Sequence, residues 1–191
     1  YDKAYKARCN GLTIISISIG QGAVNLTPLQ IANLGATIAN RGYYITPHVV
    51  KDIKGERIDT AYTTKHYTMA SRSAYDYVVT GMRSAVTSGT CRAANRSDYT
   101  VCGKTGTAQN RGQDHSIFMG FAPMDKPKIA VAVYIENARG GGGTWAAPIA
   151  SLVIEKYIKG EVERKEMEQM YMETNPCQPL PLVRKVKKKK N

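Results

Sequence analysis

The amino-acid sequence predicts an α+β fold in which helices cover an antiparallel sheet. Three successive segments with strand-like composition occupy residues 99–107, 116–122 and 128–135. A turn-forming run at residues 123–127, with a proline at each end, separates the second segment from the third and predicts antiparallel pairing between them. Segments with helical spacing precede and follow the strands, and helices packed on a sheet bury its apolar face.

The chain before these strands shows one strand pattern and one strong helix signal. Residues 12–19 are rich in β-branched side chains and alternate in polarity, so we expect a strand there. The helix signal begins at Thr27, a candidate N-cap, because Pro28 suits the first helical position and Gln30 completes a capping box. Gly42 suits the left-handed position that ends a helix.

Two further helices are predicted, one before and one after the three strands. The first spans residues 73–87 and the second residues 144–159, with Gly160 at its end. Residues 43–53 form a strand-like segment, and residues 51–70 have the composition of a surface excursion. The side chains expected to face inward are Tyr77, Val78, Met82, Ala85 and Val86 in the first helix, and Ile149, Leu152, Val153, Ile154 and Tyr157 in the second.

Charge and composition divide the chain into a folded part and an extension. We expect residues 1–160 to form the domain and residues 161–191 to add a charged helix and a basic, disordered tail. The net charge is +12, and six positive charges lie between Arg184 and Lys190. The tail has three possible interpretations: it is a solvated disordered end, it contacts an anionic membrane face or wall polymer, or it is an appended sequence. The rest is mildly basic and lacks a basic patch interleaved with aromatics, so we expect no nucleic-acid partner.

The cysteines and histidines do not form the pattern of a metal site. None of the four cysteines belongs to a Cys-x-x-Cys pair and the three histidines are far apart, so we expect no metal or other cofactor. Cys91 and Cys102 flank a short loop; buried free thiols are the default expectation, and a disulfide is the alternative in an oxidising compartment. Asp114-His115-Ser116 is not a triad, because neighbours in an extended chain point to opposite faces.

The segment "CGKTGTAQ" at residues 102–109 carries the strongest chemical signal. Its Gly-Lys-Thr run is how a nucleotide-binding P-loop ends, but that motif needs a glycine five positions before the Gly-Lys pair, where this chain has Asp98. A carboxylate there would repel phosphate, and Gly106 with Thr107 is a poor start for the helix that a P-loop requires. The segment therefore predicts a strand that carries a Lys-Thr-Gly triplet.

With its neighbours, this segment resembles the C-terminal part of class B penicillin-binding proteins. The matching stretches are "SIGQGAVNLTPLQIANLGATIANRGYYITPHVV", "GKTGTAQ", "FMGFAP" and "IAVAVYIEN", followed by a glycine-rich loop and a last helix. They occur in the family's order over roughly residues 10–160, and the elongation-specific peptidoglycan transpeptidases are the most similar branch. The resemblance implies part of the penicillin-binding transpeptidase fold, which is like that of serine β-lactamases.

Two of the family's three catalytic motifs do not occur in this sequence. The family uses Ser-x-x-Lys, Ser-x-Asn and Lys-Thr/Ser-Gly, and only the third is found here. In the family the other two lie upstream of the segment with which this chain begins, so we expect the nucleophilic serine before Tyr1. Because no acyl-enzyme forms without that serine, residues 1–191 alone are expected to be inactive.

The resemblance implies roles for four residues of the remaining motif. Lys104 lies toward the catalytic centre and supplies positive potential, and it shares a strand face with Gly106 by the two-residue period. Gly106 has no side chain, so substrate can lie against the strand edge. The N–H of Thr107 forms half of an oxyanion hole. The hydroxyls of Thr105 and Thr107 bind the substrate carboxylate, and Thr107 is the stronger candidate.

Three other features have structural interpretations. Gln21 is expected to be a loop amide rather than a substrate contact, and Trp145 to anchor the last helix on the sheet. The glycines at residues 140–143 form either a rim beside the active site or a plain linker.

The resemblance also implies the setting in which the whole protein acts. Its substrates are peptidoglycan stem peptides, and β-lactams present a carboxylate in the same place. A membrane anchor upstream of this chain would hold the catalytic domain outside the cytoplasmic membrane, with a lipid-linked glycan polymerase and elongation-complex proteins as partners. A β-lactam-sensing receptor domain and a non-catalytic scaffold of the same fold are the alternatives.

Overall fold

The computed structural model describes residues 11–22 and 24–178, and its centre is a three-stranded antiparallel sheet. The strands, in their order across the sheet, are β3 (Cys102–Ala108), β4 (His115–Ala122) and β5 (Ile129–Ile135). Thr105 of β3 lies opposite Phe118 of β4, which in turn lies opposite Val133 of β5. The three predicted strands and their antiparallel pairing are confirmed, although β3 begins later than expected.

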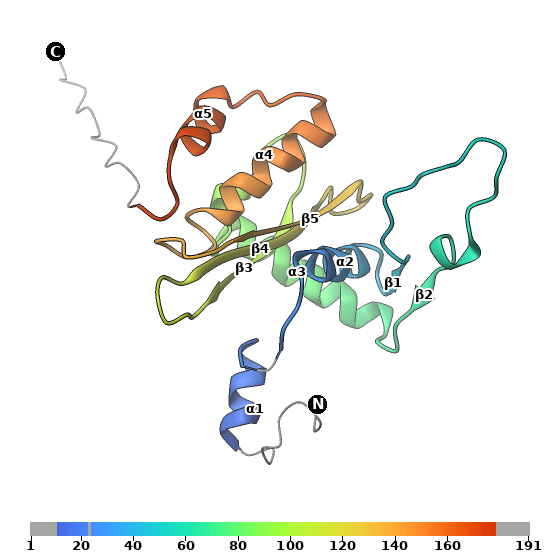
Figure 1. Cartoon of the computed structure of the whole chain (residues 1–191), viewed down its shortest axis with the longest axis horizontal. Coiled ribbons are helices and arrows are strands. Elements are labelled where there is room, and N and C mark those ends of the chain that lie inside the picture. Colours follow the sequence, from blue (N-terminus) through green and yellow to red (C-terminus); the bar gives the residue numbers. More distant parts are fainter. Residues whose placement is uncertain (1–10, 23, 179–191) are drawn as a thin grey trace.

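Helices cover both faces of this sheet (Figure 1). The helices of the described residues are α1 (Gly11–Ser18), α2 (Pro28–Ala39), α3 (Arg72–Thr87), α4 (Ala146–Lys159) and α5 (Lys165–Glu173), and of these α2, α3 and α4 contact the sheet. α2 lies on one face and α4 on the other. α3 contributes Met82 to the apolar cluster on the α2 face and Val86 to the cluster on the α4 face, so it runs along the edge of the sheet beside β3. The predicted α+β class is therefore confirmed.

The start of α2 follows the predicted local signals, and its end departs from them by one residue. The backbone N–H of Thr27 donates to Gln30 Oε1 at 2.8 Å, and the N–H of Gln30 donates to Thr27 Oγ1 at 3.3 Å, which completes the capping box. At the other end, Gly42 has a φ of 114° and donates its N–H to the carbonyl of Thr37 at 3.0 Å. The left-handed residue directly after the C-cap Asn40 is Arg41, with a φ of 59°, so Gly42 follows one position later than the left-handed glycine that the sequence predicted.

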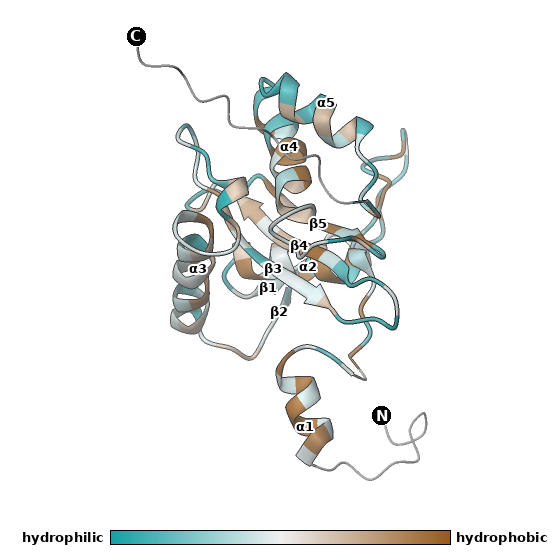
Figure 2. Ribbon diagram, turned by 90° about the vertical axis from the view of Figure 1, so that its left-hand side faces the viewer, coloured by the Kyte–Doolittle hydropathy of each residue, from teal (hydrophilic) through white to brown (hydrophobic). Residues whose placement is uncertain are grey.

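The strand predicted over residues 12–19 is wrong, because this segment forms the helix α1. Figure 2 shows α1 standing away from the sheet, with much of its ribbon in the brown of hydrophobic residues. Leu12 is 77% exposed and Ile15 is 62% exposed. β-Branched residues favour strands where a neighbouring strand packs against them. Within the described residues no strand pairs with this segment, and a helix satisfies its backbone groups locally.

The buried face of α3 is rotated from the predicted one. Met82 and Val86 are buried as predicted, and Val79 completes their face at helical spacing. Tyr77 and Val78 were also expected to face inward, but they are 81% and 46% exposed. Because the side chains from Tyr77 to Val79 are all apolar, the sequence is compatible with two different buried faces of the helix, and the contact with β3 selects the one that contains Val79.

α4 buries small side chains where large ones were expected. Leu152 and Ile154 are buried as predicted, but Val153 and Tyr157 are exposed. Small side chains let the helix approach the sheet closely, whereas the prediction favoured bulky ones. Glu155, which was not expected inside, is fully buried. The other buried residues of this helix are Ala146, Ala147, Pro148, Ala150 and Ser151.

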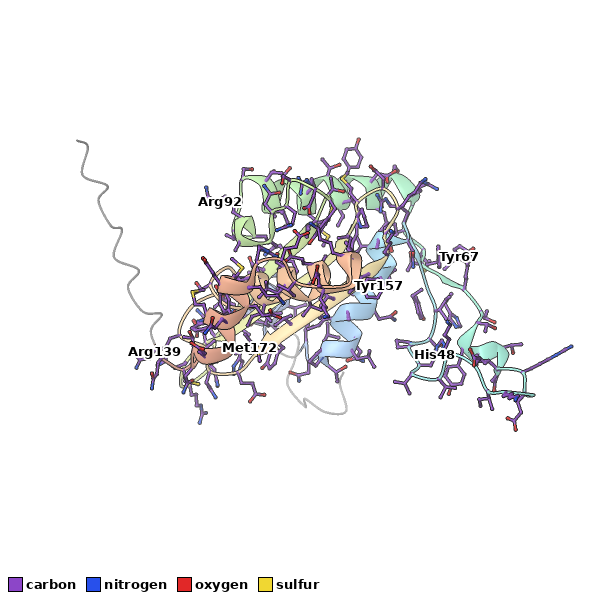
Figure 3. The ribbon with its side chains drawn as sticks, turned by 90° about the horizontal axis from the view of Figure 1, so that it is seen from above. His48, Tyr67, Arg92, Arg139, Tyr157 and Met172 are labelled. Carbon is purple, nitrogen blue, oxygen red and sulfur yellow. The ribbon has the colours of Figure 1, made fainter. Side chains whose placement is uncertain are left out.

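The segment between α2 and α3 leaves the body of the molecule as an irregular excursion (Figures 1 and 3). Its base is closed by a short antiparallel pair, β1 (Tyr43–Tyr44) with β2 (His66–Tyr67). Figure 3 shows the labelled side chains of His48 and Tyr67 on this side of the molecule. The surface excursion predicted over residues 51–70 is confirmed, but the strand-like segment at 43–53 joins a strand pair only through its first two residues and otherwise forms one isolated bridge, from Ile53 to Glu56.

The charged extension after α4 begins as predicted. Gly160 ends α4 with a φ of 86°, and α5 then packs against the start of α4. The rings of Trp145 and Tyr171 meet edge to face with centroids 5.8 Å apart, and the Tyr171 hydroxyl donates to the carbonyl of Thr144 at 3.0 Å. Trp145 is 1% exposed and donates its indole N–H to the carbonyl of Arg139 at 2.9 Å, so it joins the start of α4 to the preceding loop and to α5, and its predicted role in anchoring the last helix on the sheet stays a prediction.

Two predictions about the ends of the chain stay open. The division into residues 1–160 and 161–191 remains a prediction, and most of the basic tail, residues 179–191, lies outside the described residues. Across the part of the chain that the structure describes, no helix combines the length and apolar character needed to cross a membrane.

Candidate active site

Lys104 and Gly106 share the face of β3 that looks toward α2. In the register of the sheet, Lys104 lies opposite Met119 and Gly106 lies opposite Ile117. Met119 packs against the cluster on the α2 face, and a methyl group on Gly35 of α2 would lie 3.2 Å from its Cγ. The two-residue period predicted this shared face, which contains the one cation of the motif.

The ammonium group of Lys104 has no carboxylate partner among the described residues. Its Nζ lies 2.5 Å from the carbonyl oxygen of Thr105, and the salt bridges of this part of the chain involve other side chains. The side chain is exposed. Its positive charge is therefore available to an anionic group that comes to the edge of β3.

Every second residue of β3 directs its backbone N–H and C=O groups to the edge of the sheet, away from β4. The carbonyl of Val101 accepts a hydrogen bond from Arg83 Nη1 of α3 at 2.9 Å, and the carbonyl of Thr105 accepts one from Lys104. These two carbonyls therefore point away from β4. Because backbone groups of successive strand residues alternate in direction, the N–H of Thr107 points to the same edge.

The two threonines of the motif differ in how accessible they are. Thr105 is 8% exposed, and its Oγ1 lies 2.6 Å from Thr90 Oγ1, so its hydroxyl already has a partner. Thr107 is exposed. The sequence analysis did not identify Thr90 as a site residue, because no spacing rule links two threonines 15 residues apart.

Two of the glycines at 140–143, Gly141 and Gly142, pack directly on the strands, which favours a rim beside the motif over a plain linker. A methyl group on Gly142 would lie 2.2 Å from the carbonyl oxygen of Ile117 and 2.8 Å from that of Gly106. A methyl group on Gly141 would lie 2.8 Å from Thr107 Oγ1. The close approach of backbone to backbone explains why this loop is made of glycine.

Ser116 and His115 have separate structural roles, as expected. Ser116 is fully buried; its hydroxyl donates to the carbonyl of Gly141 at 3.1 Å and accepts from the N–H of Ala146 at 3.2 Å. It therefore joins the glycine loop to the first turn of α4. His115 Nδ1 accepts from the N–H of Asn137 at 3.1 Å, so the two side chains serve different neighbours.

A cavity of about 540 Å³ lies at the end of β3, between the sheet and the loop before α2. Ile117 and Tyr134 line it from the sheet, Gln109 from beyond β3, and Gln21 from the loop. Ile117 faces the same side as Gly106, so the cavity opens on the face that carries Lys104. Gln21, expected to be a loop amide, is therefore also part of a cavity wall.

The three cysteines of the described residues, Cys91, Cys102 and Cys177, are free thiols. Cys91 belongs to the cluster on the α4 face and Cys102 to the cluster on the α2 face, and both are buried. The alternative of a disulfide between them is thus not what the structure contains. Burial raises the pKa of the Cys102 thiol to about 11, which makes it a poor nucleophile at neutral pH.

Comparisons with known proteins agree on one family. A family model described as the penicillin-binding protein transpeptidase domain matches residues 3–155. The peptidoglycan D,D-transpeptidase MrdA of Acinetobacter baumannii is 37% identical over 163 residues, which is 75% of this chain and 24% of that protein. The chain therefore spans about a quarter of the length of this relative.

Solved structures agree with the match in sequence. Penicillin-binding protein 2 of Pseudomonas aeruginosa, in complex with WCK 5153, superposes with a TM-score of 0.71 at 33% identity, covering 86% of this chain and 37% of that one. Penicillin-binding protein A of Mycobacterium tuberculosis, as its ceftriaxone acyl-enzyme, superposes with a TM-score of 0.66 at 31% identity, covering 76% of this chain and 35% of that one.

Proposed function

This chain belongs to the penicillin-binding protein transpeptidase family, and from that premise we propose that the whole protein is a peptidoglycan D,D-transpeptidase of the elongation type. In the proposed reaction a serine attacks the peptide bond before the terminal D-alanine of a stem peptide and expels that residue. An amine of a neighbouring stem peptide then takes the acyl group and releases the serine. The observation that carries the proposal is the edge strand β3, which combines an uncompensated ammonium at Lys104 with an outward N–H at Thr107.

Within this reaction, Lys104 to Thr107 form the wall of the site opposite the nucleophile. Lys104 supplies positive potential for the substrate carboxylate and the reacting groups. The exposed hydroxyl of Thr107 binds that carboxylate, and its N–H donates to the oxyanion. Gly106 has no Cβ between the strand edge and the substrate, which supports an extended substrate lying along β3.

The nucleophile belongs to another part of the protein. The sequence has no Ser-x-x-Lys motif, so the serine of the proposed reaction comes before Tyr1, and residues 1–191 alone are inactive. β-Lactams acylate the same serine and place their carboxylate against β3. The acyl-enzyme formed by the Mycobacterium tuberculosis relative supports this part of the proposal.

Membership of this family also indicates where the whole protein acts and with which partners. We infer that a membrane anchor outside this chain holds the transpeptidase domain on the outer side of the cytoplasmic membrane, where peptidoglycan is cross-linked. A lipid-linked glycan polymerase and other elongation-complex proteins are the proposed partners, because transpeptidation acts on newly polymerised glycan.

Intact-mass analysis and peptide mapping of the full-length protein after exposure to penicillin test the proposal. We expect one adduct on a serine upstream of Tyr1. An unmodified protein would favour a non-catalytic scaffold, and an adduct within residues 1–191 would show that the nucleophile is misplaced. An assay for cross-linked stem peptides then separates a transpeptidase from a β-lactam receptor, which is acylated but forms no cross-link.

A further inference from the structure

Thr90 meets the Lys-Thr-Gly strand from outside the motif. Its Oγ1 lies 2.6 Å from Oγ1 of Thr105, and it belongs to the loop that connects α3 to β3. Thr90 is exposed whereas Thr105 is 8% exposed, so Thr90 stands between the solvent and the hydroxyl of the motif. The hydrogen bond therefore joins the buried side of β3 to an accessible side chain at its edge.

The position of Thr90 is set by its neighbours in the chain. The N–H of Gly89 donates to the carbonyl of Ser84 at 3.2 Å, and the N–H of Cys91 donates to the carbonyl of Ala85 at 3.0 Å. The Cys91 side chain is fully buried in the cluster on the α4 face. Thr90 is thus held between two residues that are bonded to the last turn of α3, and its hydroxyl has a defined place.

The glycine-rich loop encloses the same pair of hydroxyls from the other side. A methyl group on Gly142 would lie 2.9 Å from Cβ of Thr105, and a methyl group on Gly143 would lie 2.5 Å from the carbonyl oxygen of Thr90. Thr105 is therefore confined between Thr90 and the loop. A confined β-branched side chain keeps a single χ1 rotamer, so Thr90 and Gly142 together determine where the Thr105 hydroxyl points.

The hydrogen bond between two hydroxyls uses one of their two protons, so its direction determines what Thr105 can do with its own proton. If Thr90 donates, the oxygen of Thr105 is an acceptor in this pair and its own proton is free to donate to another group. A substrate carboxylate at the edge of β3 is an acceptor of this kind. Its arrival therefore favours the arrangement in which Thr90 donates to Thr105 and Thr105 donates to the carboxylate.

We propose that Thr90 is a positioning residue of the transpeptidase site, holding the Thr105 hydroxyl with its proton directed to the substrate carboxylate. The inference rests on the proposed function, since it assigns Thr90 to the carboxylate subsite of that reaction. Thr90 acts through Thr105 and does not touch the substrate. A purely structural hydroxyl pair would instead stabilise the α3–β3 loop without affecting the reaction.

The test compares the acylation rate constants of full-length variants with benzylpenicillin. Thr90→Val keeps the shape of the side chain and removes the hydroxyl, and we expect it to lower the second-order rate constant roughly 3- to 10-fold, the effect of one hydrogen bond. Thr90→Ser keeps the hydroxyl and should stay within about twofold of the wild type. Thr87→Val is the matched control, because the exposed Thr87 hydroxyl bonds only to carbonyls of its own helix.

A double-mutant cycle separates positioning from a structural role. If Thr90 acts through Thr105, the variant with both Thr90→Val and Thr105→Val should react at the rate of Thr105→Val alone. Three results would overturn the inference. The first is a double variant whose rate is reduced by the product of the two single-variant reductions. The others are a Thr90→Val rate equal to that of the wild type and a Thr90→Ser rate as low as that of Thr90→Val. If the wild-type protein itself is not acylated, the proposed function fails first and this inference falls with it.

Discussion

Gly142 lies so close to Ile117 that a methyl group on its α-carbon would be 2.2 Å from the carbonyl oxygen of that residue. The glycine-rich loop therefore rests on the backbone of β4 and, through Gly106, on β3. This contact fixes the loop over the two threonines of the motif, and the loop also accepts a hydrogen bond at Gly141 from Ser116 of β4, which lies 25 residues away in sequence.

Replacing Gly142 by alanine should displace the loop from the strands and weaken the site. The new methyl group meets two carbonyl oxygens, which belong to the backbone and cannot rotate away. We expect a loss of about 1–3 kcal/mol in the free energy of unfolding and a slower acylation by penicillin. Thermal unfolding and acylation rates of the full-length protein measure both effects.

Gly81→Ala is the matched control for this change. A methyl group on Gly81, in the exposed middle of α3, has no atom within 4 Å. It should leave acylation unchanged and stabilise the helix by up to about 1 kcal/mol. Equal effects of the two substitutions would contradict the role given to Gly142.

Removing the charge of Lys104 should slow acylation without unfolding the protein. Its ammonium is exposed and has no carboxylate partner in the described residues, so the fold gains little from it. A charge-assisted contact contributes about 1.5–3 kcal/mol, and Lys104→Ala should reduce the acylation rate constant roughly 10- to 100-fold. Lys128→Ala, an exposed lysine beside β5, is the control, and a similar loss there would argue against a specific role.

A buried carboxylate in α4 should be a weak point of the fold if its partner is removed. Glu155 is fully buried; its Oε2 lies 2.8 Å from Nε of Arg164, and its Oε1 lies 3.2 Å from Nη2 of Arg96. Arg164→Met should cost about 3 kcal/mol in the free energy of unfolding, because Glu155 then lacks one of its two cations. Denaturant unfolding measures this cost, and Arg92→Met, which changes an exposed arginine, should have little effect.

The same region should make the protein sensitive to acid through Asp98. The guanidinium of Arg96, and then the ammonium of Lys159, hold the pKa of the Asp98 carboxyl well below its usual range. A lowered folded-state pKa stabilises the fold above the unfolded pKa of about 4, and this contribution is lost as the pH falls below that value. The stability difference between wild type and Asp98→Asn should therefore shrink between pH 7 and pH 3, and a constant difference would contradict it.

Cys102 should resist alkylation in the folded protein. Burial raises its pKa to about 11, so its thiolate fraction is very small at pH 8 and increases only as the pH approaches 11. Peptide mapping after iodoacetamide treatment at pH 8 should find Cys102 unmodified in the native protein and modified in urea. The exposed Cys177 serves as the internal control, and equal labelling of the two native thiols would contradict the burial.

The sequence by itself determined the features that depend on neighbours in the chain. The capping box of Thr27 and Gln30 joins residues three positions apart, and Gly160 ends α4 through its own left-handed backbone conformation. The alternation of β3 placed Lys104 and Gly106 on one face. Each of these rests on bonds or angles within a few residues, so a short stretch of sequence contains the whole cause.

Only the tertiary structure decided the features that depend on distant partners. Residues 11–18 are helical because no strand lies beside them in the described part of the chain, and Glu155 is buried because Arg96 and Arg164 reach it from two other segments. The bond between Thr90 and Thr105 arises because α3 runs along the edge of β3. The physical reason is the same in each case: burial and pairing depend on which segments meet, and no local pattern records the partner.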